Sequence, residues 1–217
     1  MMSATMTQAS AHPLLSKHRI EALSDGVFAI AMTLLVLEIK VPDLPRHAPS
    51  SAIWQGLGSQ WAVIFAFIVT FVLAAVFWSS QHMMLNALAH LTAPLLVMNL
   101  FLLMFVALLP FSTAMLGHFI SSPVAIAIYL GNHLAISGGV GVQMLYGSRH
   151  KLIMEMDPHR LQRLKARVYA VPVGCVAALG FAAIAPQYAF LGFALVIVAV
   201  RLWVKRGARP APEPRRS

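Results

Sequence analysis

A short polar cluster opens the first long apolar stretch of the sequence, and it holds the side chains best suited to chemistry. Residues 19–26 read RIEALSDG, and the apolar run VFAIAMTLLVL follows directly. An ionisable side chain in a membrane segment is energetically expensive and normally faces protein or water. We therefore expect Ser24 and Asp25 to point into a helix bundle rather than towards lipid.

Hydrogen-bonding partners for this cluster occur in the next apolar runs and just before it. Trp78 and His82 are spaced i, i+4 near the end of the second run, and both side chains can donate hydrogen bonds. Asn99 in the third run and Arg19 are further candidates. A local alternative is that Ser24 or Asp25 caps the start of the first helix, which contributes about 1 kcal/mol. The two roles are compatible.

The opposite face of the same helix is apolar. At about 100° per residue, Leu23, Ile30, Leu34 and Leu37 fall on one stripe, which Thr33 flanks. The polar cluster lies more than about 100° away from this stripe. Taken alone, the stripe fits ordinary helix packing as well as the wall of a pore.

The composition places the chain among integral membrane proteins. Of its 217 residues 59% are hydrophobic and 11% are charged, whereas soluble domains carry about 25% charged residues. The apolar runs lack the period of two that membrane β-barrels show. The sequence therefore predicts an all-α fold with six spans between a lead of residues 1–18 and a basic tail of residues 207–217; the spans are expected at 24–39, 61–80, 93–116, 123–146, 168–185 and 188–204.

The basic residues indicate an orientation. With the N-terminus in the cytoplasm, fourteen of the 16 Lys and Arg residues fall inside and only Lys40 and Arg46 fall outside. The net charge of +9 lies beside the apolar runs, which favours contact with anionic lipid headgroups and argues against nucleic acid as a partner. We therefore expect a multi-pass protein of the inner (plasma) membrane with both termini cytoplasmic. The segment 42–60 is its longest outside loop.

The polar cluster also carries a family resemblance. Arg19, Leu23, Ser24, Asp25 and Gly26 resemble the motif Arg-x-x-x-Phe-Ser-Asp-Gly that opens the first membrane helix of the TMEM175 potassium channels. The resemblance continues through FWSSQHMML at 77–85, Asn-Leu at 99–100 and LLPFST at 108–113. It covers roughly the first half of the chain, and Leu23 replaces the phenylalanine of the motif.

This resemblance implies a homotetramer whose first helices line a central pore without a re-entrant filter. Ile30 would form the narrowest ring, with Leu34 and Leu37 beside it, and Thr33 would provide the preference for potassium. The remaining motif residues would hold the first helix in place; these are Arg19, Ser24, Asp25, Gly26, Trp78, His82 and Asn99.

The favoured function is thus a passive, moderately potassium-selective cation channel whose permeant ion is K⁺, with no cofactor. The sequence contains no nucleophile–base pair or phosphate loop that would indicate an enzyme. One alternative is a proton- or ion-coupled transporter with Asp25 and His82 as a relay, although the sequence shows no convincing internal repeat. A second is a membrane haem protein using His82 and His133.

Other features of the spans favour packing roles. The stretch GGVGVQMLYG at 138–147 is only faintly similar to a potassium filter, and its small residues are typical of close helix contacts. Asn132 and His133 are expected to form hydrogen bonds between helices. Glu38 and Lys40 are expected as surface charges or as a weak field at the outer mouth. The prolines are expected at helix starts (Pro94, Pro123), at helix ends (Pro110, Pro186) and at a kink (Pro172).

Overall fold

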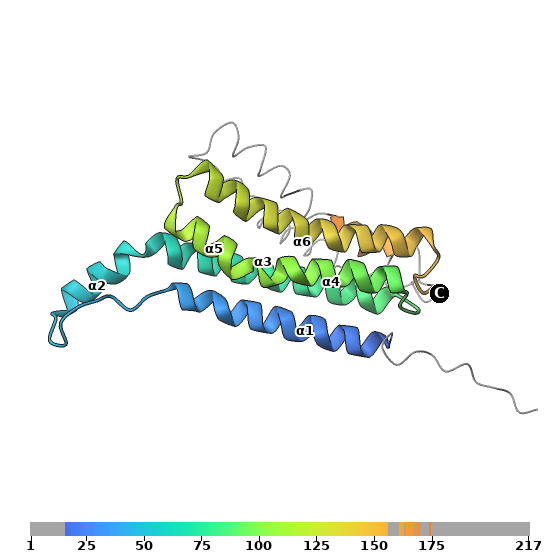
Figure 1. Cartoon of the computed structure of the whole chain (residues 1–217), viewed down its shortest axis with the longest axis horizontal. Coiled ribbons are helices and arrows are strands. Elements are labelled where there is room, and N and C mark those ends of the chain that lie inside the picture. Colours follow the sequence, from blue (N-terminus) through green and yellow to red (C-terminus); the bar gives the residue numbers. More distant parts are fainter. Residues whose placement is uncertain (1–15, 156–160, 163, 167, 170–173, 175–217) are drawn as a thin grey trace, which may run out of the picture.

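A computed structural model of the chain describes residues 16–155, 161–162, 164–166, 168–169 and 174. Within these residues the fold is helical and contains no strand beyond one isolated bridge, Leu88 to Ile153. The elements, labelled in Figure 1, are α1 (Lys17–Leu34), η2 (Leu35–Glu38), α2 (Ser50–Ser59), α3 (Trp61–Ala87), α4 (Ala93–Ala107), α5 (Leu109–His118) and α6 (Pro123–Arg149).

Four helical stretches in the described part of the chain are long and apolar enough to cross a membrane. They are Lys17–Glu38, Trp61–Ala87, Ala93–His118 and Pro123–Arg149. They correspond to the first four predicted spans. The predicted fifth and sixth spans, with Pro172 and Pro186, fall almost wholly outside the described residues.

The helix boundaries differ from the predicted ones mainly at the inner ends. α1 begins at Lys17, seven residues before the predicted start, and α3 continues to Ala87 instead of ending at residue 80. The apolar run marks the part of a helix that lies in hydrocarbon, while the helix itself extends further into polar surroundings. The hypothesis that Ser24 or Asp25 caps the first helix is therefore wrong, because the N-cap is Ser16.

The third span is divided in two. α4 ends at Ala107 and α5 begins at Leu109, with Pro110 in its first turn. A proline has no N–H to donate to the preceding turn but is well tolerated at a helix start. Pro110 was expected at a helix end and instead opens a helix, whereas Pro94 and Pro123 stand in the first turns of α4 and α6 as expected.

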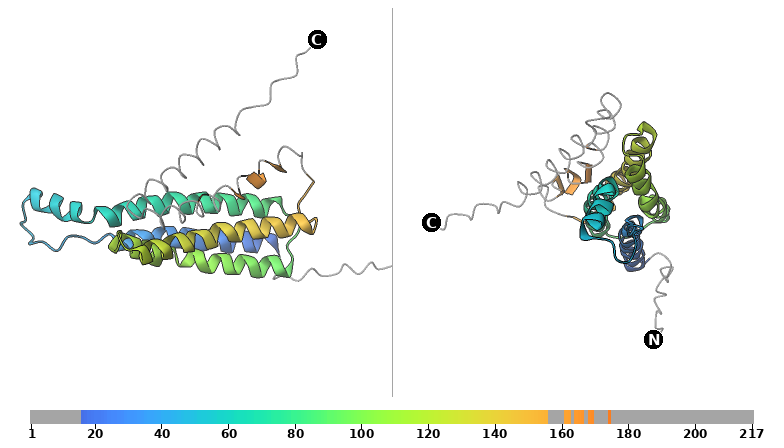
Figure 2. Two further views of the ribbon diagram at one scale, coloured as in Figure 1. Left: turned by 90° about the horizontal axis from the view of Figure 1, so that it is seen from above. Right: turned by 90° about the vertical axis from the view of Figure 1, so that its left-hand side faces the viewer.

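The four spans form an elongated bundle in which α1 packs against α3 and α4, and α6 covers α4 and α5 (Figures 1 and 2). The start of α1 and the end of α3 lie at the same end as the start of α4 and the end of α6. The core between the helices is filled by large apolar side chains with little or no exposure, among them Phe77, Leu102, Val106, Leu109 and Ile136.

Close helix approaches depend on glycine at a few positions. A Cβ atom on Gly117 of α5 would lie 3.0 Å from the Cα of Val63 in α3, and one on Gly139 of α6 would lie 3.3 Å from Leu102. Small residues allow membrane helices to approach in this way. The packing interpretation of 138–147 is thus confirmed at Gly139, while Gly138 faces open space.

The predicted outside loop at 42–60 contains the short helix α2, which was not expected. α2 stands at one end of the bundle (Figure 1) and buries none of its residues completely. It rests on the segment before it, because a Cβ on Gly56 would lie 2.7 Å from Pro42.

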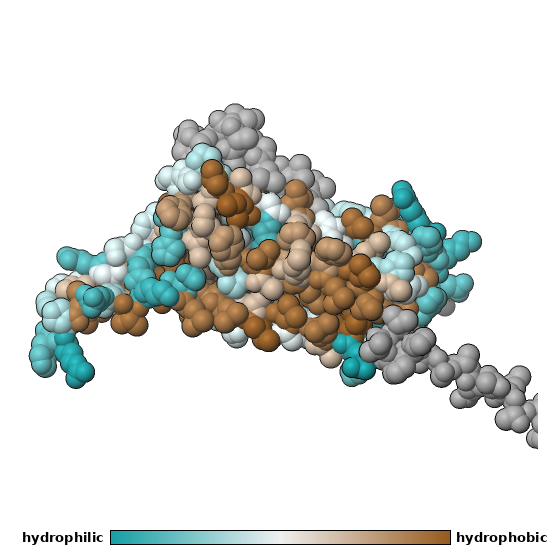
Figure 3. Space-filling view, in the orientation of Figure 1, coloured by the Kyte–Doolittle hydropathy of each residue, from teal (hydrophilic) through white to brown (hydrophobic). Residues whose placement is uncertain are grey.

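The face shown in Figure 3 carries a broad apolar belt over the helices and polar groups at the two ends. Lys17, Arg19, Arg149 and Lys151 belong to the end where α1 starts, while Lys40 follows the opposite end of α1. A belt of this kind is the surface that a protein presents to lipid.

Candidate functional site

The first membrane helix has two different faces. The residues that α1 and η2 bury are spaced three or four apart and turn towards the bundle; they are Ile20, Ser24, Phe28, Ala31 and Leu35. The predicted stripe lies on the other side and is left uncovered within the chain. Ile30 is 61% exposed, Leu37 60%, Leu23 43% and Leu34 42%. Packing within the subunit therefore does not account for this stripe.

Thr33 also lies on the exposed side. Its hydroxyl donates a hydrogen bond to the carbonyl of Ile30 at 2.8 Å. The hydroxyl proton is thus turned towards the helix, and the oxygen lone pairs remain available on its outer side. Leu37 lies in η2 rather than in the α-helix, so the wheel at about 100° per residue does not extend to this position.

A buried chain of polar side chains joins α1 to three other helices. The hydroxyl of Ser24 donates to the carbonyl of Ile20 at 2.8 Å and accepts a bond from Asn99 Nδ2 of α4 at 3.2 Å. Gln81 of α3 donates from Nε2 to Asn99 Oδ1 and, at 3.3 Å, to Gln143 Oε1 of α6. The expected contact of Ser24 with Asn99 is present, and this part of the cluster does point into the bundle.

Asp25 lies at the edge of the bundle. Trp78 of α3 donates from Nε1 to Asp25 Oδ1 at 2.7 Å, as the sequence suggested for Trp78. Asp25 itself is exposed in the single chain, so the expectation that it would point into the interior of the bundle is wrong. Asp25 directly follows buried Ser24, and neighbouring residues of an α-helix point in directions about 100° apart.

His82 supports the indole of Trp78 and does not bind the acid. The two rings are stacked with centroids 5.6 Å apart, and His82 Nε2 lies 2.9 Å from Asn86 Nδ2 one turn further along α3. The described structure therefore does not bring Asp25 and His82 into the direct contact that a proton relay would need.

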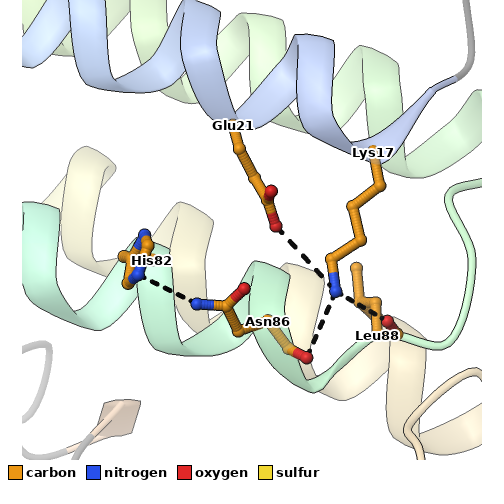
Figure 4. A network of polar contacts seen from close by, with 5 residues as sticks. All are labelled: Lys17, Glu21, His82, Asn86 and Leu88. Carbon is orange, nitrogen blue, oxygen red and sulfur yellow. Dashed lines mark hydrogen bonds and ion pairs between the residues drawn. The ribbon is translucent and has the colours of Figure 1, made fainter.

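Lys17 ties the inner end of α1 to the end of α3. Its Nζ donates to the carbonyls of Asn86 at 3.2 Å and Leu88 at 3.0 Å, and Glu21 lies 3.8 Å away (Figure 4). Free carbonyls at a helix C-terminus attract a cation, both as hydrogen-bond acceptors and through the helix dipole. Arg19 is exposed, and its side chain makes no hydrogen bond or ion pair among the described residues, so the structure does not bring it into this network.

The outer end of the first helix is tied to α3 and α5. The side-chain amide of Gln60 accepts from the N–H of Lys40 at 2.9 Å and donates to its carbonyl at 2.7 Å. His118 of α5 lies 3.7 Å from the carboxylate of Glu38. Glu38 and Lys40 are thus engaged within the subunit, since Lys40 Nζ also donates to the carbonyl of Leu37 at 2.8 Å.

A second polar cluster joins α3, α5 and α6 away from α1. Thr113 donates to Thr70 at 3.0 Å, and the hydroxyls of Thr70 and Tyr129 lie 3.0 Å apart. Asn132 donates to Ser112 across the α5–α6 contact at 3.0 Å, which confirms its predicted role between helices. His133 bonds to the carbonyl of Tyr129 in its own helix at 2.8 Å and packs its ring on Phe77 of α3.

Several supports of α1 were missed in the sequence, and only some of them left a signal. Lys17, Glu21 and Ser24 follow the i, i+4, i+7 spacing of one helix face, which a wheel extended towards the N-terminus would have found. Gln81 and Gln143 are single amides within apolar runs, and nothing in the sequence indicates that they meet. Within the described residues no group of three His, Cys, Asp or Glu side chains could hold a metal ion.

Comparisons with known proteins agree with the motif found in the sequence. The family model described as "Endosomal/lysosomal potassium channel TMEM175" matches residues 19–110. A potassium channel of Streptomyces collinus is 41% identical over 115 residues, which cover 51% of this chain and 54% of that protein. A potassium channel of Chamaesiphon minutus is 41% identical over 122 residues, covering 55% and 60% respectively. The chain thus matches little more than half the length of these two relatives.

A vertebrate protein and a solved structure extend the comparison. The endosomal/lysosomal proton channel TMEM175 of Bos taurus is 32% identical over 117 residues, 52% of this chain and 24% of that protein. The crystal structure of a lysosomal potassium-selective channel TMEM175 homolog from Chamaesiphon minutus superposes with a TM-score of 0.73 at 28% identity, covering 89% of this chain and 98% of that one. These relatives are named as ion channels and not as enzymes, and residues 19–110 of this chain are a segment of the TMEM175 family.

Proposed function

We propose that this chain is a passive, moderately potassium-selective cation channel, built as a homotetramer of six-span subunits with the first helix of each subunit lining a central pore. One observation carries the proposal. Among the described residues, the polar contacts that hold α1 lie towards its own bundle, at its edge with α3 or at its ends, while the stripe of Ile30, Leu34 and Leu37 is left uncovered. A helix held from behind in this way is suited to present its free face to a shared axis.

The constriction is hydrophobic. A ring of four Ile30 side chains would exclude water and leave a passing ion without solvation, which stops conduction until the ring widens. Leu34 and Leu37 would continue this apolar lining towards the outer end. Ile30 and Leu37 are left uncovered to the same degree, at 61% and 60%, and the placement of the narrowest ring at Ile30 comes from the family resemblance.

Selectivity would come from Thr33. Four hydroxyl oxygens, each with its proton engaged by the helix backbone, could replace part of the hydration shell of a potassium ion. A ring with so few oxygens discriminates less sharply than a filter of stacked carbonyls. This supports a moderate preference for potassium over sodium.

The orientation follows from the basic residues. Lys17, Arg19, Arg149 and Lys151 lie at one end of the described bundle, and the positive-inside rule assigns this end to the cytoplasm. With six spans both termini would be cytoplasmic. The naming of bacterial relatives as potassium channels fits a place in the inner membrane, where lipids and identical subunits are the partners.

Ion flux into liposomes tests the proposal. We expect K⁺-driven flux from the reconstituted chain, weaker flux with Na⁺, and a clear rise with Ile30→Asn because a polar ring retains water. Ile68→Asn is the matched control, since Ile68 lies on α3 with a comparable exposure of 53%. A proton gradient forms a third arm, because the vertebrate relatives are named proton channels. A correctly assembled Ile30→Asn protein with unchanged flux, or an equal rise in the Ile68 control, contradicts the pore assignment.

A further inference from the structure

The buried chain of amides contains two glutamines that were not among the residues expected to hold the first helix. Gln81 is 1% exposed and Gln143 is fully buried. Gln81 stands at the centre, because its single Nε2 donates both to Asn99 of α4 and to Gln143 of α6. Through Asn99 the chain reaches Ser24, so α6 is connected to α1 although α3 and α4 lie between them.

The two glutamines do not fit a role in stability alone. Within the described residues, Gln81 Oε1 and Gln143 Nε2 are buried and have no hydrogen-bond partner. A buried polar atom without a partner is unfavourable, and a partly satisfied network is less stable than apolar packing of the same volume. Leucine at position 143 would remove an unpaired atom and leave the bond from Gln81 to Asn99 in place, so a purely structural argument would favour leucine there. Leucine at position 81 would remove an unpaired oxygen but would also take the donor away from Asn99 Oδ1.

The geometry of α1 indicates that the buried chain of amides can control the rotation of this helix. Ser24 precedes Ile30 by six residues, which is about 120° around the helix and about 9 Å along it. The bond from Asn99 to Ser24 therefore fixes the rotation of α1 at a point where Ile30 faces away from the bundle. A rotation of α1 by a few tens of degrees would move Ile30 sideways without unfolding the helix.

We infer that Gln81 and Gln143 are positioning residues that set the rotation of the first helix, and hence which side chains face the pore. The inference rests on the proposed function, since it assumes that Ile30 meets its copies at a shared axis. Gln81 holds Asn99 in the orientation that bonds Ser24, and Gln143 holds Gln81 from α6. The buried chain of amides thus couples the rotation of α1 about its own axis to the position of α6. In the proposed channel α6 does not line the pore.

Disulfide crosslinking between subunits measures this rotation directly. The parent protein carries Cys175→Ser, and single cysteines are then introduced as Ile30→Cys, Thr33→Cys or Leu34→Cys, because positions 33 and 34 lie on opposite sides of position 30 around the helix. Membranes are oxidised, and crosslinked dimers are separated without reductant. We expect the strongest crosslink from Ile30→Cys in the parent. Adding Gln81→Leu should shift the strongest crosslink to position 33 or 34, according to the direction of the rotation, and Gln143→Leu should shift it less, because it removes only the far bond.

A matched control separates positioning from stability. Thr70→Val removes a buried hydroxyl from α3 and breaks its bonds to Thr113 of α5 and Tyr129 of α6, neither of which leads to α1. We expect Thr70→Val to lower the melting temperature and leave the crosslinking pattern unchanged. Gln143→Leu should change the pattern while the melting temperature stays equal or rises.

The outcomes distinguish this inference from the proposed function. If Ile30→Cys does not crosslink in the parent, the pore assignment fails and the inference fails with it. If Ile30→Cys crosslinks and neither glutamine substitution moves the pattern, the inference alone is wrong. If Gln81→Leu prevents assembly, the Gln143→Leu variant decides between the two roles. A lower melting temperature with an unchanged crosslinking pattern in that variant would show that the glutamines are purely structural.

Discussion

Trp78 Nε1 lies 2.7 Å from Asp25 Oδ1, so the acid in the middle of α1 is held by the neighbouring helix α3. This bond places the carboxylate on the side of α1 that meets α3 and away from the exposed stripe of Ile30 and Leu34. Asp25 therefore acts as an anchor of the helix, and its charge is not presented along the apolar face.

The anchor can be measured with a double-mutant cycle. Asp25→Ala and Trp78→Phe should each lower the stability of the purified protein, and the double variant should lose less than the sum of the two by about 1 kcal/mol, the usual size of such a coupling at a partly exposed site. The readout is thermal or denaturant unfolding in detergent. Strict additivity would show that the two side chains act independently. A changed preference between K⁺ and Na⁺ in an intact Asp25→Asn protein would place the acid in the conduit instead.

Substitutions of Thr33 test the source of selectivity. Thr33→Ala removes the hydroxyl oxygen from the exposed face and should lower the preference for K⁺ over Na⁺ by a factor of a few, with total flux retained. Thr33→Ser is the control, because it keeps the oxygen and its bond to the carbonyl of Ile30. Reversal potentials under mixed K⁺ and Na⁺ gradients provide the measurement. Equal selectivity in all three proteins would assign the preference to another part of the pore.

Three of the four starts of the membrane helices could be predicted from the sequence, whereas the start of α1 was placed too late and the end of α3 too early. The predicted starts at Trp61, Ala93 and Pro123 are those of the structure, because proline and the onset of an apolar run both mark a helix start. The end of α3 was placed too early because Gln81, His82 and Asn86 remain helical beyond the hydrocarbon. The break at Leu108 was missed because the apolar pattern runs through it.

The candidate site divides in a similar way. The two faces of α1 follow from its sequence, and so do the contacts of Ser24 with Asn99 and of Asp25 with Trp78. The bonds made by Gln81 and Gln143 depend on how α3, α4 and α6 cross, which no pattern within one helix contains. The sequence likewise favoured Arg19 as a support of α1, because the crossing of α1 and α3 could not be predicted. In the structure it is Lys17 that reaches the end of α3.

Lys17 is expected to hold the inner end of the bundle. Lys17→Met removes the bonds to the carbonyls of Asn86 and Leu88 and should lower stability by about 1 kcal/mol, as expected for a cation lost from a helix C-terminus. Arg19→Met is the matched control: it removes the same charge from an exposed side chain without such bonds among the described residues. Hydrogen exchange of the first turns of α1 and the last turn of α3 should rise only in the Lys17 variant. Equal effects of both substitutions would indicate a general effect of charge instead of a specific tether.

Glycine-to-alanine substitutions test the helix crossings with the same chemical change at contrasting sites. Gly117→Ala places a methyl group 3.0 Å from the Cα of Val63, and a backbone atom cannot move aside as a side chain can. The α3–α5 crossing must then open, at an expected cost of about 1–3 kcal/mol. Gly131→Ala and Gly138→Ala on α6 meet nothing within 4 Å, and alanine favours a helix over glycine by roughly 0.5–1 kcal/mol. Melting temperatures in one detergent should therefore fall for Gly117→Ala and stay level or rise for the other two. A fall at Gly131 or Gly138 as large as that at Gly117 would mean that another surface, such as a neighbouring subunit, packs on α6 at that position.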